Sequence, residues 1–396
     1  MTSPMGTYPR PQLSGPDVET LDVSVVIPCL NEAETIGICV TKARGAMERD
    51  GLGGEVIVVD NGSTDGSDGI AHDAGARVIR EQRKGYGNAY LAGFSAARGE
   101  YVVMGDGDDT YNFDEVARFL EPLRSGKAEM VIGSRLRGHI HKGAMPPLHR
   151  YVGNPILTGI LNLFYRSGVS DAHCGMRAFR RDVLERLDLR MPGMEFASEM
   201  VIRASKAGLR IDEIPIEYHA RRGESKLNSF RDGWRHLRFL LVHSPTYLFL
   251  VPGLVMFAIG ALAMATVMVN LNLLGRAWDL HAMIAASMLT IAGAQVIALG
   301  LAARAYGVHH LGEHDRLFDR FDGRVRLEHG LLAGFGVLLA GFAAAASVVI
   351  VWIDRGFGAL GEERLAVLSL TLFVVGLQIV FTSFFLSIVG LRRTDR

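Results

Sequence analysis

The sequence contains little cysteine and no excess of charge of either sign. Its 396 residues include three cysteines, Cys29, Cys39 and Cys174, at spacings that fit neither a disulfide framework nor a zinc site. Lysine plus arginine and aspartate plus glutamate number 42 each, so the chain lacks the basic excess common in nucleic-acid-binding proteins. These absences argue against a disulfide-stapled secreted domain and against a nucleic-acid partner.

The N-terminal segment lacks the apolar core of a secretory signal. Residues 1–21 are polar and rich in proline, so we expect a flexible tail that remains in the cytoplasm. The sequence also lacks a Walker A phosphate loop, which argues against phosphoryl transfer.

Charged residues are missing from four long stretches in the C-terminal part of the chain. A helix rises about 1.5 Å per residue, so about 20 residues cross a hydrocarbon core of roughly 30 Å. Buried helices of soluble proteins seldom run this far without a charge. We therefore predict a membrane domain over residues 247–396, with spans at about 247–274, 281–304, 331–353 and 366–391.

The flanks of these stretches predict how the chain is oriented. Basic residues concentrate before the first span, after the second and after the fourth, which by the positive-inside rule places these segments in the cytoplasm. In a bacterium the protein would be a multi-pass protein of the plasma membrane. Small residues within the spans, such as Gly334, Gly336 and Gly341, suit close helix packing or homo-oligomer contacts.

Short apolar runs alternate with helical patterns before the first span. The strand candidates are residues 23–27, 55–59, 77–79, 101–104 and 130–132. Helical patterns begin at Glu32 and cover residues 87–97 and 114–123. This alternation predicts an α/β domain over residues 22–226 with a mostly parallel sheet, and the polar motifs follow the carboxyl ends of its strands.

Acidic residues gather around the fourth strand candidate. Six occur within sixteen residues that contain no lysine or arginine, namely Glu100, Asp106, Asp108, Asp109, Asp114 and Glu115. Converging carboxylates repel one another unless a cation compensates, and oxygen ligands suit Mg²⁺ or Mn²⁺. A solvated turn is the alternative interpretation of Asp106 and Asp108. Asp114 and Glu115 also fit a helix N-terminus.

Four motifs occur in order along the domain. Pro28 precedes Asn31 and Glu32 after the first strand, and residues 60–65 (DNGSTD) follow the second. Residues 84–89 (KGYGNA) precede a helix, and residues 105–109 (GDGDD) follow the fourth strand. Together they resemble the family 2 glycosyltransferases, whose nucleotide-sugar-binding fold is called GT-A.

Motifs further along resemble one subgroup of that family. Residues 171–179 (DAHCGMRAF), Glu195 with Glu199, and residues 221–226 (RRGESK) occur in the order found in polyprenyl-phosphate glycosyltransferases such as the dolichol-phosphate mannose synthases. The four-span tail fits members of this subgroup that carry membrane anchors. The resemblance implies transfer of a hexose from GDP-mannose or UDP-glucose to a polyprenyl or dolichyl phosphate.

The resemblance also implies roles for individual residues. The nucleotide sugar would be bound by Pro28, Asn31, Glu32, Asp60, Asn61, Lys84, Asp106 and Gly107. Asp106 and Asp108 would face the diphosphate and its Mg²⁺ or Mn²⁺, and Gly107 would leave room for the diphosphate. This sequence has Asp-Gly-Asp where Asp-Ala-Asp is usual, and Tyr-Asn-Phe follows, so Asp109 is the candidate for a third metal ligand.

The expected acceptor shapes the catalytic set. A phosphate monoester has a second pKa near 6, so at cytoplasmic pH it is already a nucleophilic dianion that needs positioning and charge screening. We therefore expect no dedicated base. The catalytic residues would be Asp108, with Arg135, Arg222 and Lys226 meeting phosphate groups.

Two apolar stripes are candidates for contact with membrane lipids. A juxtamembrane amphipathic helix is predicted over residues 227–246, with an apolar stripe at Leu227, Phe230, Trp234, Leu237 and Leu241. A second stripe includes Met145, Leu148, Val152, Ile156, Ile160, Leu163 and Phe164. It fits a segment that lies on the membrane, with ordinary core as the alternative.

Two other functions are weighed against this one. A processive polysaccharide synthase shares the early motifs, but its Gln-x-x-Arg-Trp acceptor motif has no match here, since residues 232–235 read DGWR. A lipid-linked sugar flippase or transporter would be expected to carry ionisable groups in its spans, whereas the four charge-free stretches contain no Asp, Glu, Lys or Arg.

Overall fold

The computed structural model describes residues 21–222, 229–271, 278–311, 327–358 and 361–389. The chain divides into two compact units, Met1–Leu240 and Leu241–Arg396, which are described separately. Residues 1–20 of the expected tail (1–21) and the candidate phosphate ligand Lys226 lie outside the described residues.

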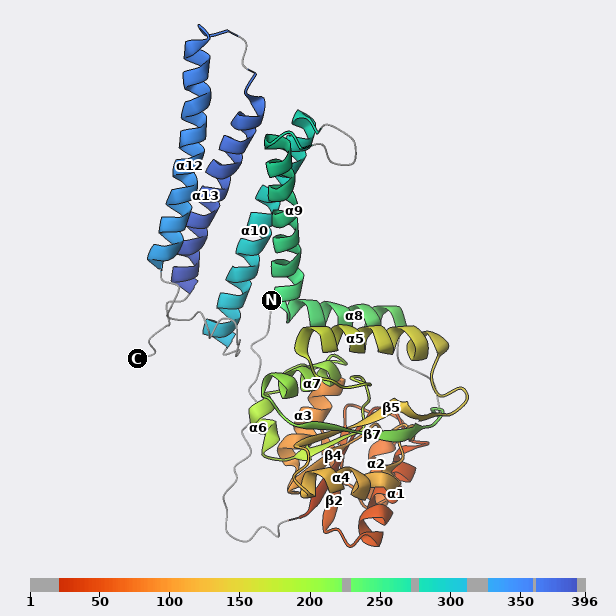
Figure 1. The fold of residues 1–396 in the computed structure, drawn as a ribbon. Helices are drawn as coiled ribbons and strands as arrows, with labels where there is room; N and C mark the ends of the chain where they lie inside the picture. The colour runs from red at the N-terminus through yellow and green to blue at the C-terminus, as the bar shows by residue number, and fades with distance from the viewer. Residues whose placement is uncertain (1–20, 223–228, 272–277, 312–326, 359–360, 390–396) are drawn as a thin grey trace, which may run out of the picture. The chain divides into compact units, whose positions relative to one another are not determined.

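The first unit is built on a seven-stranded sheet in the order β3-β2-β1-β4-β6-β5-β7 (Figure 1). Strands β1 to β4 are parallel, β5 is parallel to β7, and β6 is antiparallel to both of its neighbours. The strands are β1 (Val23–Cys29), β2 (Gly54–Asp60), β3 (Arg77–Arg80), β4 (Tyr101–Met104), β5 (Met130–Ile140), β6 (Arg177–Arg180) and β7 (Ile211–Tyr218). The predicted α/β fold with a mostly parallel sheet is confirmed.

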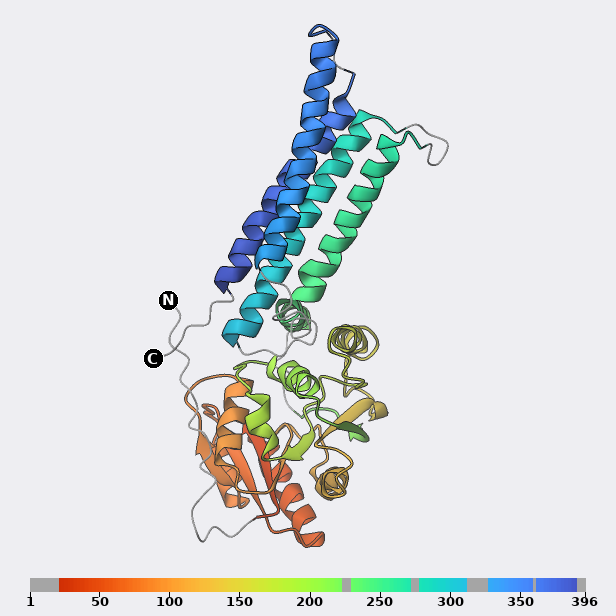
Figure 2. The same cartoon turned by 60° about the vertical axis from the view of Figure 1, so that its left-hand side comes forward.

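Helices cover both faces of this sheet (Figure 1 and Figure 2). α1 (Ile36–Arg49) packs against α2 (Ser67–Asp73) and α4 (Val116–Arg124), whereas α3 (Tyr86–Ala96) packs against α7 (Phe196–Lys206). α6 (Val183–Leu187) also contacts α7. The central strands are therefore buried on both sides, which explains why β1 and β4 read as continuous apolar runs without alternation.

Strand β5 is longer than the sequence pattern indicates. We expected it to end near Ile132, but it continues to Ile140. Beyond Ser134 its partner in the ladder is β7, with an irregular register in which Gly138 crosses close to Ile216. A Cβ on Gly138 would lie 1.9 Å from the Ile216 carbonyl oxygen, so the crossing requires glycine. The outer part of β5 after Ile132 is mostly polar, so the apolar run in the sequence ends before the strand does.

The reversed strand β6 determines what reaches the carboxyl edge of the sheet. Since β6 is antiparallel to β4, the segment that precedes it lies at the edge where the parallel strands end. That segment is residues 170–176, which contain most of the DAHCGMR motif. The sequence did not predict this strand, because four residues reading Arg-Ala-Phe-Arg give no clear strand signal.

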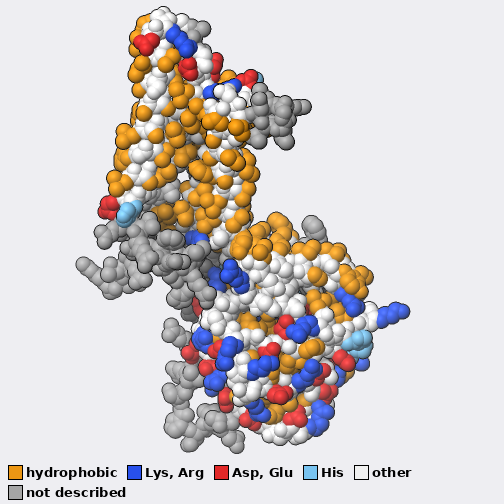
Figure 3. All heavy atoms as spheres, viewed as in Figure 1, with side chains coloured by type: hydrophobic (Ala, Val, Ile, Leu, Met, Phe, Trp, Pro, Cys, Tyr) orange, Lys and Arg blue, Asp and Glu red, His pale blue; other side chains and the backbone are white. Residues whose placement is uncertain are grey.

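The second unit consists of long apolar helices. They are α9 (Val251–Met268) with the π-helical turn η3 (Thr246–Leu250) before it, α10 (Leu280–Leu311), α12 (Leu327–Asp354) and α13 (Glu363–Val389). Four segments are long and apolar enough to cross a membrane, with mean hydropathy from 1.9 to 2.4. Figure 3 shows hydrophobic side chains along them and charged ones near their ends. The first helix ends at Met268, earlier than the predicted residue 274. The chain turns just after this helix end, at Asn270, which has a positive φ.

Small and polar side chains join these helices. Gly334 and Gly341 on α12 face α13, since a Cβ on either would come within about 3.0 Å of its backbone. Gly336, expected at the same kind of contact, has nothing within 4 Å among the described residues. Between α10 and α13, the Gln378 amide donates to Gln295 at 3.1 Å, and Ser287 and Thr371 share a hydrogen bond of 2.7 Å.

Candidate active site

Two tyrosines hold the first aspartate of the Asp-Gly-Asp motif. Tyr86 and Tyr90, on successive turns of α3, donate their hydroxyls to Oδ1 of Asp106 at 2.9 and 3.2 Å. Burial and the charge of Asp108 raise the pKa of Asp106 to about 6, and the tyrosine hydrogen bonds work against this rise. Its other oxygen, Oδ2, lies beside Gly175, where a Cβ would come within 2.7 Å. Gly175 therefore leaves the space that this carboxylate occupies.

The second aspartate faces a cation from the end of the first unit. Oδ1 of Asp108 accepts from the Thr110 hydroxyl at 2.7 Å and from the Thr110 backbone N–H at 3.2 Å. Oδ2 of Asp108 lies 3.2 Å from a guanidinium nitrogen of Arg221. The same guanidinium pairs with Glu32. Arg221 thus bridges two acids that follow different strands.

The donor set of these two aspartates fits a hard divalent cation. In each, protein hydroxyls hold Oδ1, while Oδ2 has a different environment: Arg221 for Asp108 and the space beside Gly175 for Asp106. Carboxylate oxygens are the ligands that Mg²⁺ and Mn²⁺ take most readily. A positive charge already compensates Asp108 here, which is the electrostatic situation that a bound cation would reproduce.

Asp109 has a different environment from its two neighbours. Its backbone adopts a left-handed conformation with φ of 58°, and Lys42 of α1 pairs with its Oδ1 at 2.6 Å. Nε of Arg222 lies 4.0 Å from its Oδ2. Two cations therefore neutralise the residue that the sequence suggested as a third metal ligand.

The remaining acids of the cluster lie away from Asp106. Glu100 precedes β4 and so lies at the opposite end of the strand. Asp114 and Glu115 lie in the 3-10 turn η1 (Phe113–Glu115), as their expected place before α4 implied. They pair with Arg49 and Arg118.

Asn61 organises the loop that carries Lys84. Its amide nitrogen donates to the carbonyl oxygens of Glu81 and Arg83 at 2.9 Å each, and its side-chain oxygen accepts from the Gly85 N–H at 2.7 Å. Asp60, also buried, accepts from the Ser63 N–H at 3.0 Å within its own turn. The structure thus brings the second and third motifs together and leaves Lys84 exposed.

The first motif packs against both the second and the fourth. Asn31, with φ of 53°, accepts from the Thr64 N–H at 2.8 Å, and its own N–H donates to Ser63. A Cβ on Gly107 would lie 3.1 Å from the Pro28 carbonyl oxygen, so the missing side chain at Gly107 allows close packing on β1. We had expected that glycine to make room for a diphosphate.

Arg135 is largely occupied by an internal partner. Its Nε and Nη2 donate to the two oxygens of Asp171 at 2.7 and 2.8 Å. The guanidinium also lies 5.2 Å from the centre of the Tyr218 ring. Arg135 therefore joins β5 to the segment before β6 at this edge of the sheet.

Sequence reasoning missed four residues that shape this edge. Arg221 was passed over in favour of Arg222, and Tyr86, Tyr90 and Arg177 received no role. Arg177 is fully buried and donates to the carbonyl oxygens of Cys174, Ala197 and Ala172, which fixes the segment before β6. The spacing of Tyr86 and Tyr90, which places them on one helix face, was a signal available in the sequence.

Two helices of the first unit expose apolar side chains. On α5 (Asn154–Tyr165), Ile156 and Leu163 are 55% and 62% exposed, while Leu161 faces the core. α8 (Ser229–Val242) exposes Trp234 and buries Phe239 and Leu240. Figure 3 shows orange side chains over this part of the first unit. Part of each predicted stripe is therefore on the surface.

Comparisons with known proteins agree with this architecture. Residues 24–188 match the model of glycosyl transferase family 2, and residues 301–390 match the family 2 C-terminal transmembrane region. The low-salt glycan biosynthesis hexosyltransferase Agl6 of Haloferax volcanii is 45% identical over 368 residues, which cover 93% of this chain and 89% of that protein.

Other matches cover the first unit. A dolichyl-phosphate hexose transferase of Haloferax volcanii is 35% identical over 214 residues, covering 54% of this chain and 89% of that protein. Among solved structures, glucosyl-3-phosphoglycerate synthase from Mycobacterium tuberculosis aligns with a TM-score of 0.47 and 25% identity, covering 57% of this chain and 80% of that chain.

The near full-length match determines the family. It extends over both units, and a second family match covers α12, α13 and the end of α10, so the catalytic and membrane parts are assigned together. The chain belongs to glycosyltransferase family 2 and is a membrane-bound glycosyltransferase.

Proposed function

We propose that this enzyme transfers a hexose from a nucleotide sugar to a polyprenyl or dolichyl phosphate at the cytoplasmic face of the membrane, with inversion at C1 and with Mg²⁺ or Mn²⁺. The observation that carries the proposal is the pairing of Asp108 with Arg221 at one edge of the sheet, close enough to Asp106 for the Asp108 charge to raise the pKa of Asp106. The names of the two relatives, a hexosyltransferase and a dolichyl-phosphate hexose transferase, support the sugar and the acceptor class.

The donor diphosphate would bind where carboxylates and guanidinium meet. Asp106 and Asp108 would hold the metal ion, which stabilises the charge that develops on the leaving diphosphate. Nε of Arg221 is buried and has no hydrogen-bond partner among the described residues. A phosphate oxygen of the donor would satisfy this nitrogen, which costs free energy while it is unpaired.

The acceptor phosphate would need cations and no base. One of its oxygens forms the bond to C1 of the sugar, and the C1–oxygen bond to the diphosphate breaks with the electron pair leaving on the diphosphate. Arg222, which is 61% exposed in its side chain, remains our candidate for orienting the attacking phosphate, together with Lys226. Arg135 would contribute mainly its positive charge, because Asp171 takes two of its donors.

The exposed apolar faces suit an acceptor that stays in the bilayer. α5 and α8 present Ile156, Leu163 and Trp234 to the surface of the first unit. Such faces lie in the interface between headgroups and acyl chains. We propose that they seat the catalytic unit on the membrane, so that the phosphate of the acceptor reaches the site while its prenyl chain remains in lipid.

The test follows labelled sugar into lipid. Purified protein is incubated with a polyprenyl phosphate, with Mg²⁺ or Mn²⁺, and with labelled GDP-mannose or UDP-glucose in turn. We expect label in the organic extract, loss of that label with EDTA and in Asp108→Asn, and near-normal label in Asp114→Asn. Asp114 is a matched control because it belongs to the same acidic segment but pairs with Arg49 outside the site.

Other outcomes would favour the alternatives. Label in a water-soluble polymer would support a processive synthase. Donor binding without transfer to any acceptor would support a transporter and would remove Arg222 and Lys226 from the catalytic set.

A further inference from the structure

The ends of β5 and β7 place several metal-binding side chains on one side of the sheet. In the register of these parallel strands, His139 pairs with Glu217 and Ile140 with Tyr218. Side chains alternate along a strand, so His141 shares a face with His139, and His219 shares that face with Glu217. On the other face Ile140 is buried. Strand geometry therefore brings three imidazoles and one carboxylate together.

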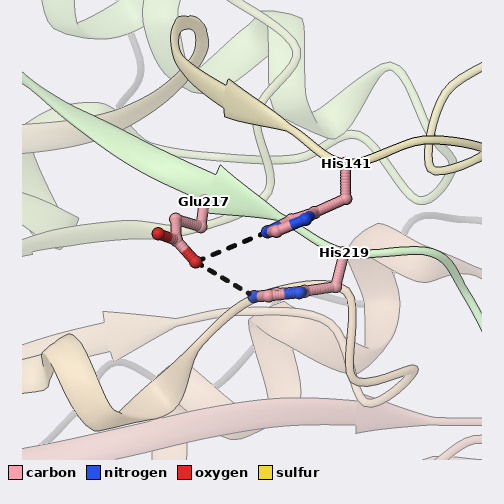
Figure 4. Close-up of side chains that lie close together, drawn as sticks. All are labelled: His141, Glu217 and His219. Carbon is pink, nitrogen blue, oxygen red and sulfur yellow. Dashed lines mark hydrogen bonds and ion pairs between the residues drawn. The ribbon is translucent and has the colours of Figure 1, made fainter.

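Three of these side chains converge. Nε2 of His141 lies 3.5 Å from Oε2 of Glu217, and Nε2 of His219 lies 3.7 Å from the same oxygen. The two imidazole rings stack with centres 4.5 Å apart and planes 17° apart. Figure 4 shows both rings directed toward the Glu217 carboxylate from neighbouring chain segments. One ligand atom from each residue falls within 4.8 Å of the others.

We propose that His141, Glu217 and His219 bind a transition-metal ion such as Zn²⁺. Around a tetrahedral ion with bonds near 2.1 Å, ligand atoms are separated by about 3.4 Å, and the two distances to Glu217 are close to this value. Imidazole ligands favour Zn²⁺, Co²⁺ or Ni²⁺ over Mg²⁺. Three protein ligands would leave a coordination position for water or an anion.

The site differs from the aspartate pair in chemistry and in what it connects. The aspartates offer oxygen alone, whereas this cluster offers two nitrogens and one carboxylate. His141 follows β5 on the path to α5, and His219 precedes Arg221 by two residues. A bound ion would link the segment that follows β5 to the segment that follows β7. It would thereby restrain the segment that carries Arg221 and Arg222.

Backbone hydrogen bonds already hold the segments that follow β5 and β7 in place. The His141 N–H donates to the Tyr218 carbonyl oxygen at 3.0 Å, and the His219 N–H donates to the Thr110 carbonyl oxygen at 3.0 Å. Main-chain hydrogen bonds thus hold the backbones of His141 and His219, while the three ligand side chains are 40–55% exposed and open to an ion from solvent. An ordinary ion pair between protonated histidine and Glu217 is the competing explanation.

Binding of Zn²⁺ alone tests the proposal without donor or acceptor. The full-length protein is purified in detergent with a tag that contains no histidine, and Zn²⁺ is titrated in competition with a chromophoric chelator. We expect one equivalent that persists in Asp108→Asn. His141→Ala and His219→Ala should weaken it by about 100-fold or more, since losing even an outer-shell partner of a metal costs about 10–100-fold.

Matched variants separate binding from folding. His72→Ala removes an exposed histidine that pairs with Asp73 on α2 and should bind Zn²⁺ as the wild type does. Glu217→Gln keeps the shape of the side chain and should weaken binding, and Zn²⁺ should raise the unfolding midpoint of the wild type but not of this variant. Absence of a Zn²⁺ equivalent in the wild type, or unchanged binding in His141→Ala, would leave an ordinary ion pair only and overturn the proposal.

Discussion

Arg135 and Asp171 form a bidentate ion pair inside the first unit. Both side chains are almost wholly buried, at 8% and 0% exposure. Burial alone would raise the pKa of Asp171, but the charge and hydrogen bonds of Arg135 hold it below its usual value. The pair links β5 to the segment before β6, so the arginine that sequence reasoning assigned to phosphate also supports the framework.

Breaking this pair should destabilise the protein. Arg135→Met or Asp171→Asn leaves a buried group without its partner, and such changes cost about 3–5 kcal/mol. We expect the thermal unfolding midpoint to fall by roughly 10 °C in either single variant. In Arg135→Met/Asp171→Leu, which buries no charge, most of that loss should be recovered. If the single variants unfold like the wild type but lose transfer, Arg135 acts on phosphate and not on stability.

The tyrosines on α3 should tune metal binding at Asp106. Tyr86→Phe and Tyr90→Phe each remove a hydrogen bond to the carboxylate, and a bond to a charged group is worth about 1.5–3 kcal/mol. We expect each change to raise the Mn²⁺ concentration needed for half-maximal transfer by about tenfold. Tyr101→Phe, on the same sheet but at the start of β4, is the control. Equal metal requirements in all three variants would contradict the positioning role.

Removing Arg221 should separate metal binding from turnover. Without the guanidinium, Asp108 and Glu32 lose a shared counter-charge, so Mn²⁺ should bind about tenfold more tightly in Arg221→Ala, which is about 1.4 kcal/mol. Transfer should nonetheless fall, because the donor diphosphate loses its partner. Calorimetry with Mn²⁺ alone measures the first effect and labelled lipid measures the second. Weaker metal binding in this variant would show that Arg221 supports the aspartates and does not compete with the ion.

The buried His173 should make stability depend on pH. Burial and the nearby His236 lower the pKa of His173 from 6.5 to about 3. Between these values the unfolded chain binds a proton that the folded chain does not, so stability is lost as pH falls below 6.5. The loss should reach about 1.4 kcal/mol at pH 5.5.

A glutamine variant can check this dependence. His173→Gln should remove that part of the fall in unfolding midpoint between pH 7 and pH 5.5, whereas His72→Gln, an exposed position, should not. Ser198, whose hydroxyl lies 3.3 Å from His173 and 3.1 Å from His236, belongs to the same cluster. A wild-type midpoint that is flat from pH 7 to pH 5.5 would refute the assignment.

The exposed face of α5 should affect sugar transfer only when the acceptor lies in a membrane. In Ile156→Ser/Leu163→Ser, two exposed side chains become polar, so the unfolding midpoint should change little. Transfer to a long-chain polyprenyl phosphate in bilayers should fall severalfold, while transfer to a short, water-soluble prenyl phosphate should not. Ile70→Ser, on exposed α2, is the comparison. Equal loss with both acceptors would point to the catalytic site itself.

The fold was predictable where apolar residues dominate the pattern. Strands buried on both faces, such as β1 and β4, read directly from runs like Val-Ser-Val-Val-Ile, and charge-free stretches located the long helices. The outer part of β5 and all of β6 and β7 (Ile211–Tyr218) were not, because their pairing depends on residues far away in the chain. The residues within a strand do not indicate which distant strand it pairs with.

The candidate site was predictable in its motifs and not in its contacts. Asp106 and Asp108 were visible as acids after a strand. The spacing of Tyr86 and Tyr90 places them on one helix face, but it does not indicate that this face meets Asp106. The choice between Arg221 and Arg222 depends on which way adjacent side chains point after β7 leaves the sheet. Adjacent residues in extended chain face opposite sides, so an error of one residue exchanges an internal ion pair for an exposed one.

The four-residue strand β6 has a consequence for how the first unit opens. It is bonded to β4 on one side and β5 on the other, so it joins the part of the sheet that carries Asp60 and Asp106 to the part that carries Arg135 and His219. Adjacent amides of a strand point to opposite neighbours, so those of Ala178 and Phe179 are expected to exchange with solvent deuterium when one or the other of these two ladders opens. Their exchange rates therefore report how often the two halves of the active site come apart.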